Sequence, residues 1–176
     1  MVPFKKFSSK WRSVVYHILM LTGLAVAVFM VHGSSDNGAA TQRNGTSTAR
    51  GTFEVKVTPQ PKDEKAAGPF DRLFIAKQFH GDLEAVSQGQ MMAANTSVEG
   101  SGAYVALELV SGTLGGKRGS FVLQHKGTMR RGRYEMLVTV VPDSGTDGLS
   151  GIAGTMTILI DGSKHSYEFE YTLGPD

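Results

Sequence analysis

The sequence contains no cysteine among its 176 residues. This absence excludes disulfide bonds, thiolate catalysis and cysteine-ligated zinc or iron–sulfur centres. It leaves the redox compartment open, because a chain without cysteine suits either side of a membrane.

A surplus of positive charge is also missing from most of the chain. Four of the 18 basic residues lie within residues 5–12, so the remaining 14 stand against 16 acidic residues. A nucleic-acid-binding surface needs a basic face or stripe, and none is expected here. The local cluster of Arg130, Arg131 and Arg133 is interpreted as a solvated hairpin tip.

Recognisable catalytic and cofactor motifs are absent as well. The GTLGGK segment at 112–117 lacks the spacing and the following helix of a phosphate loop. The GLSG segment at 148–151 lacks the glycine spacing of a serine elbow. No histidine or carboxylate spacing supports a metal site. The sequence therefore predicts no metal and no cofactor.

The N-terminal segment contains one long apolar run, residues 14–31, without a formally charged side chain. As a helix it measures about 27 Å, close to the thickness of a hydrocarbon core. The basic residues precede the run, so the positive-inside rule sends the following domain across the membrane. Residues 1–33 are either a cleaved signal peptide or a retained anchor. The length of the run favours the anchor, because the apolar region of a signal peptide is usually about 7–15 residues.

Three regions are therefore expected. Residues 1–33 form the signal or anchor helix, and residues 34–49 form a flexible Ser/Thr/Asn/Gly-rich tether. Residues 50–176 form the folded domain. The protein is expected to be membrane-anchored with an extracytoplasmic domain, or secreted or periplasmic if the signal is cleaved.

The folded domain reads as eight short strands separated by glycine-rich or proline-containing turns. Phe53, Val55 and Val57 alternate with polar residues, which is the period of a half-buried strand. The expected strands are residues 51–58, 72–80, 82–94, 103–114, 120–129, 134–141, 154–160 and 165–173. Closure removes exposed sheet edges. The fold class is thus all-β, a closed eight-stranded antiparallel barrel preceded by one N-terminal helix; a two-sheet sandwich is the alternative.

Several strings resemble a bacterial family called domain of unknown function 3224. They are GTFEV at 51–55 followed by PQP at 59–61, KQFHGDL at 77–83, GSFVLQH at 119–125, VPDSGT at 141–146 and HSY at 165–167. The resemblance covers residues 51–173. It implies a fold like the barrel of allene oxide cyclase and favours the barrel over the sandwich. It implies no activity, and no catalytic residue of the cyclase can be transferred. The N-terminal apolar segment departs from the bare domain that is usual in this family.

Four polar side chains embedded in apolar strands are the candidate ligand contacts: His80, Glu108, Gln124 and His125. A buried carboxylate at Glu108 would have a raised pKa and suit proton transfer, whereas an exposed one would pair with a cation on a neighbouring strand. Neighbouring residues on a strand face opposite ways. His125 shares a face with Phe121, and Gln124 shares one with Lys126. We therefore expect His125 to point inward and Gln124 outward.

These observations leave three classes of function open. The first is a membrane-tethered or exported barrel that binds a small, partly apolar molecule. The second is a cyclase or isomerase with a carboxylate or histidine inside the barrel. The third is a filled barrel that acts as a protein-interaction module. The ligand and the oligomeric state cannot be predicted from these residues.

Overall fold

A computed structural model describes residues 45–61, 68 and 70–174. The expected N-terminal helix at 1–33 and most of the expected tether lie outside these residues. Within the described part of the chain, no helix is long and apolar enough to cross a membrane. The predictions about the anchor and the tether therefore remain predictions.

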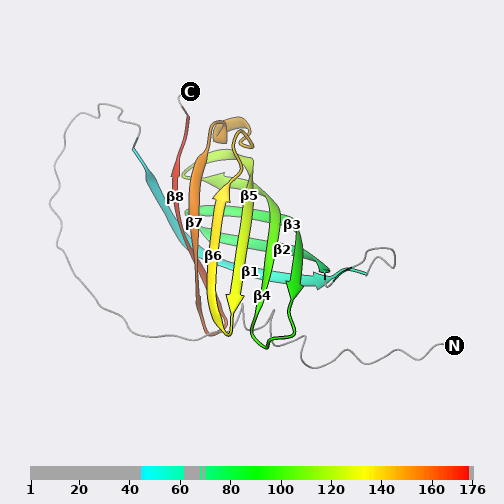
Figure 1. Ribbon diagram of the computed structural model, residues 1–176. Helices are drawn as coiled ribbons and strands as arrows, with labels where there is room; N and C mark the ends of the chain where they lie inside the picture. Colours follow the sequence, from blue (N-terminus) through cyan, green and yellow to red (C-terminus); the bar gives the residue numbers. More distant parts are fainter. Residues whose placement is uncertain (1–44, 62–67, 69, 175–176) are drawn as a thin grey trace, which may run out of the picture.

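Eight β-strands make up the described part of the chain (Figure 1). They are β1 (Ser47–Pro59), β2 (Phe70–Gly81), β3 (Leu83–Asn95), β4 (Gly102–Leu114), β5 (Lys117–Arg130), β6 (Arg133–Val140), β7 (Ala153–Asp161) and β8 (Lys164–Thr172). Each expected strand is found. The tether was expected to extend to Ala49, but β1 already begins at Ser47. Ala49 is buried and pairs with Phe169, because β8 supplies hydrogen-bond partners for this stretch.

The strands form one closed antiparallel barrel in chain order, and β1 pairs with both β2 and β8. The sandwich alternative is thereby excluded, since the sheet has no free edge. Seven of the pairs are formed by strands that follow each other in the sequence, and only β1–β8 joins the two ends of the barrel. The pairing between β6 and β7 is the weakest and has a single registered pair, Thr139 with Thr155.

Side chains alternate between the lumen and the outside along the strands. In β3 and β4 nearly every second residue is buried, and the residues between them are exposed. Tyr104 shows how the lumen accommodates large rings: it lies beside Gly127 of the paired strand, where a Cβ atom would come within 2.1 Å of the ring. Glycine at 127 therefore leaves the space into which the Tyr104 ring packs.

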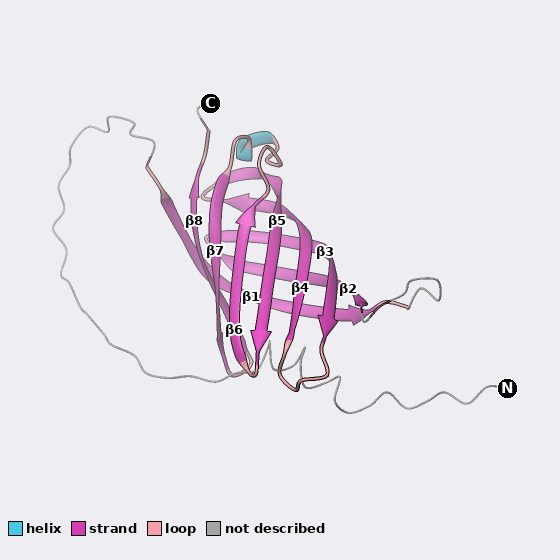
Figure 2. Ribbon diagram, in the orientation of Figure 1, coloured by secondary structure: helices cyan, strands magenta, loops and turns pink. Residues whose placement is uncertain are grey.

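One end of the barrel is filled by apolar side chains. The short 3₁₀ helix η1 (Asp147–Leu149) lies in the β6–β7 connection at this end (Figure 2). Leu149 and Ile152 of the connection are buried against the core. Thr146 and Ser144 attach the connection to β5, because their hydroxyls accept hydrogen bonds from the N–H groups of Ser120 and Val122, each at 3.0 Å. We call this the closed end.

The Arg130–Arg133 segment is a hairpin tip, as predicted. Arg131 and Gly132 both have positive φ angles, 51° and 83°, which is typical of a tight turn. The three arginines are exposed. The tip joins β5 and β6 at the end of the barrel opposite to η1 (Figure 1).

Candidate functional site

Four polar residues meet inside the barrel: Lys77 of β2, Ser87 of β3, Glu108 of β4 and His125 of β5. We call them the Glu108 cluster. All four are buried, and each occupies an inward position of its strand. The register places them together, because Lys77 pairs with Ser87, and Glu108 and His125 follow on the next two strands.

Glu108 lies at the centre of the cluster and is fully buried. Nζ of Lys77 donates to its Oε2 at 2.7 Å, and the hydroxyl of Ser87 donates to Oε1. The ammonium of Lys77 also lies 5.1 Å from the ring centre of Phe53 and 5.5 Å from that of Phe79. These contacts compensate for the cost of removing the two charges from water.

His125 approaches the same carboxylate without forming a well-aligned hydrogen bond. Its Nε2 lies 2.8 Å from Oε2 of Glu108, which is an ion-pair distance. The ring N–H is nevertheless not directed at that oxygen, so Nε2 is buried without a hydrogen-bond partner.

The charges of the cluster follow from these contacts. Burial by itself raises the pKa of Glu108, but Lys77 and His125 oppose it and lower the pKa to about 2. Glu108 is therefore a carboxylate at neutral pH. Burial lowers the pKa of His125, and Lys77 lowers it further against the opposing effect of Glu108, so the imidazole is neutral. The expectation that a buried Glu108 has a raised pKa is wrong, because its cationic partner is buried with it.

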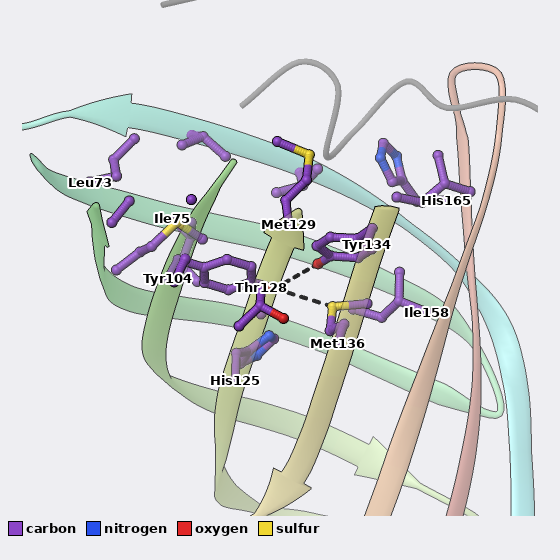
Figure 3. A pocket seen from close by; sticks show the side chains of 18 of the residues that line it. Leu73, Ile75, Tyr104, His125, Thr128, Met129, Tyr134, Met136, Ile158 and His165 are labelled. Carbon is purple, nitrogen blue, oxygen red and sulfur yellow. Dashed lines mark hydrogen bonds between the residues drawn. The ribbon is translucent and has the colours of Figure 1, made fainter. Parts of the chain in front are cut away.

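A cavity extends from this cluster to the end of the barrel opposite to η1, which we call the open end (Figure 3). Its volume is about 90 Å³. Its walls are mainly apolar and include Phe53, Val55, Ile75, Met91, Met129, Met136 and Ile158. Lys77 and His125 line its inner part, whereas Glu108 lies behind them and does not line it.

Other polar groups line the cavity further out. The hydroxyls of Tyr104 and Tyr134 lie 3.1 Å apart, and the Tyr104 hydroxyl donates to Sδ of Met136 at 3.2 Å (Figure 3). Burial raises the pKa of both tyrosines, so both are protonated. His165 packs against Phe53 with ring centres 5.2 Å apart, and its buried Nε2 has no hydrogen-bond partner. Burial and the charge of Lys77 lower the pKa of His165.

The structure separates the four candidate residues into two groups. Glu108 and His125 point inward and touch each other, and Gln124 is exposed, so the assignment of His125 inward and Gln124 outward is confirmed. The alternative of an exposed Glu108 is wrong. His80 is exposed near the closed end, with Nδ1 3.4 Å from a carboxylate oxygen of Glu84. His80 and Gln124 therefore do not line the cavity.

Sequence reasoning missed Lys77 and Ser87. Lys77 has the same parity as Leu73, Ile75 and Phe79, so the signal was present in β2. It was hidden because Phe74 and Ala76 make the other face of this strand apolar as well. Ser87 carries no comparable signal, because a serine suits either face of a strand.

The cluster has no metal-binding geometry. Among the residues that the structure describes, no three His, Asp or Glu side chains are grouped so that they could hold a metal ion. The nitrogen-containing groups that face the cavity include one ammonium and two imidazoles, and the hydroxyls of Tyr104 and Tyr134 lie further out. They are suited to hydrogen bonding rather than to metal coordination.

Together these features define a small closed β-barrel with a partly open lumen and a buried Lys–Glu–His cluster. The chain belongs to the family described as protein of unknown function (DUF3224), which it matches over residues 49–171. It is similar to the crystal structure of a protein of unknown function from this family in Shewanella oneidensis MR-1. The two share 43% sequence identity with a TM-score of 0.70, and the match covers 75% of this chain and 100% of that one. No curated protein matches.

Proposed function

We propose that this protein binds a small, largely apolar molecule in the lumen of the barrel. The observation that supports this proposal is the cavity at the open end, whose apolar walls lead to two polar side chains, Lys77 and His125. An apolar chamber with a few polar groups is typical of small-molecule sites. The third alternative, a filled barrel, fits less well because the lumen is filled at the closed end only.

The size of the cavity limits the ligand. The cavity volume is about 90 Å³. Sites for drug-sized molecules measure about 300–1,000 Å³. The ligand is therefore compact, with about one ring or a short branched chain.

The second alternative, a cyclase or isomerase, now depends on His125. Glu108 is ionised but lies behind Lys77 and His125, with its oxygens already accepting from Ser87 and Lys77. His125 is the neutral imidazole that lines the chamber. Ligand binding is the function that these contacts support best, and any proton transfer would follow from it.

Extraction of the purified full-length chain with organic solvent, followed by mass spectrometry, tests the proposal. We expect a compact apolar compound in near-stoichiometric amount from the unmodified chain. Val57→Trp should remove it, because Val57 lines the cavity and an indole would fill the space. Lys56→Trp, the exposed neighbour on the same strand, is the matched control and should retain the compound. Equal recovery from Val57→Trp and the unmodified chain would contradict binding in the lumen.

We further propose that the barrel lies outside the cytoplasm, tethered by residues 1–33 or released from them. The proposal is supported by the basic residues that precede the apolar run. An alkaline phosphatase fusion after residue 50 should be active in a bacterial host, and a reporter that works only in the cytoplasm should be silent there. The reverse pattern would refute this topology.

A further inference from the structure

Apolar side chains are concentrated on the outer face of β4 and its neighbours, although this face is exposed to solvent. Val105, Leu107 and Leu109 follow one another along the outward row of β4 and are 51–57% exposed. The register places Met92 of β3 beside Val105, and Val122 of β5 beside Leu109. A contiguous exposed apolar surface typically marks an interaction site, whereas single exposed apolar residues need no explanation.

Charged side chains are almost absent from this face but are frequent on another side of the barrel. The outward positions of β3 and β4 carry a single charge, that of Glu84 near the start of β3. The outward positions of β1 and β8 carry six charges, those of Arg50, Glu54, Lys56, Lys164, Glu168 and Glu170. Depletion of charge distinguishes the core of a protein interface from the rest of the surface. The apolar residues therefore lie where an interface core is expected.

Glutamine amides lie among these apolar side chains and indicate what covers them. Gln90 of β3 and Gln124 of β5 pair with Leu107 from its two sides, and Gln88 pairs with Leu109. Lipid hydrocarbon would leave these amides without hydrogen-bond partners, which is costly. A second copy of the same face offers amides that both donate and accept, and it brings no like charge to repel the first. We call these residues the β4 face: Gln88, Gln90, Met92, Val105, Leu107, Leu109, Val122 and Gln124.

The shape and size of the β4 face also suit a second copy. A depression lies beside Leu107, and it is lined by Arg72, Gln90, Met92, Val105 and Gln124, among others. Across a twofold axis, the apolar row of each copy can lie against the depression of the other. Strands β2–β5 contain 12–14 residues each (Figure 1), and about half of them face outward, so roughly 25 residues are available per chain. Stable interfaces use about 20–30 residues from each partner.

We propose that the β4 face binds the same face of a second copy of this chain, with Leu107 near the twofold axis. The face runs along the side of the barrel, so the dimer leaves the open end of the lumen accessible. This inference goes beyond the proposed function and does not depend on ligand binding.

Chemical cross-linking in bacterial cells that express two differently tagged copies of the full-length chain tests the proposal. Because the chain has no cysteine, Leu107→Cys introduces a single thiol into each copy. A short bismaleimide, whose reach matches the roughly 10 Å between packed sheets, should join most of the copies into a product of twice the chain mass that carries both tags. Leu159→Cys is the matched control and should not be joined, because Leu159 is 54% exposed against 56% for Leu107 but lies on β7.

A charge placed on the β4 face gives a second measurement. Val105→Glu in the Leu107→Cys chain should lower the cross-linked fraction at least about tenfold, because two like charges would face each other across the axis. Leu159→Glu in the same chain should leave the fraction unchanged. Both substitutions are at exposed positions, so the barrel should fold in both variants, as circular dichroism would show.

The remaining outcomes would overturn the proposal. If Leu107→Cys reacts with a monofunctional maleimide but is not cross-linked, the β4 face is free. If it reacts with neither reagent and the two tagged copies do not co-purify, a membrane, another protein or another segment of this chain covers the face. Equal cross-linking of Leu107→Cys and Leu159→Cys would show that the copies associate through a different part of the chain.

Discussion

Lys77→Met should lower the free energy of unfolding by about 3–5 kcal/mol at neutral pH. The substitution keeps the volume of the side chain but removes the cation that lies 2.7 Å from Oε2 of Glu108. Glu108 is fully buried, so its charge would remain without an adequate partner. Urea unfolding followed by circular dichroism measures the loss.

Two further variants show that the loss arises from the ion pair. Lys77→Met combined with Glu108→Leu should recover most of the stability, because replacing both partners removes the uncompensated charge. Lys126→Met, at an exposed position of β5, should change stability by no more than about 0.5 kcal/mol. A loss below about 1 kcal/mol for Lys77→Met would show that Glu108 is not held as an ion in the folded barrel.

Phe169→Ala should destabilise the barrel by about 3–5 kcal/mol for a different reason. Its ring is fully buried in the closed end and stacks with Phe121 and Tyr171, at centroid distances of 5.7 and 5.3 Å. Truncation removes apolar burial and leaves a cavity that the closed sheet cannot fill by moving one strand. Thermal and urea unfolding measure the effect.

Leu159→Ala is the matched control, since Leu159 lies on the neighbouring strand but is 54% exposed. It should change the stability by about 0.5 kcal/mol or less. Similar losses for the two variants would contradict the division of β7 and β8 into inner and outer faces.

Most of the fold could be predicted from the sequence because its strands alternate and its turns are marked by glycine. The start of β1 was missed for a physical reason. Ser47, Thr48 and Ala49 carry no apolar period, and their strand conformation comes from pairing with β8, which lies at the other end of the chain. The residue pattern of one strand does not show which distant strand will pair with it.

The site could be predicted only in part. Strand parity placed His125 inward and Gln124 outward, and it allowed an inward Glu108. The pairing of Glu108 with Lys77 depends on the register between β2, β3 and β4, which sequence patterns do not give. The direction of the pKa shift of Glu108 depends on its contact with Lys77, which the sequence did not predict. Burial alone raises the pKa of a carboxyl group, whereas a cation buried beside it lowers the pKa.

The pairing of β1 with β8 also has a consequence for how the chain folds. The seven other pairs join strands that follow each other in the sequence, whereas this one must wait until the last strand has been synthesised. Before then, β1 and β8 each have one unpaired edge, and Phe53 and Phe169 lack some of the partners that bury them in the finished barrel. We therefore expect closure to be the step at which two newly made chains can exchange strands, and refolding yield should rise on dilution.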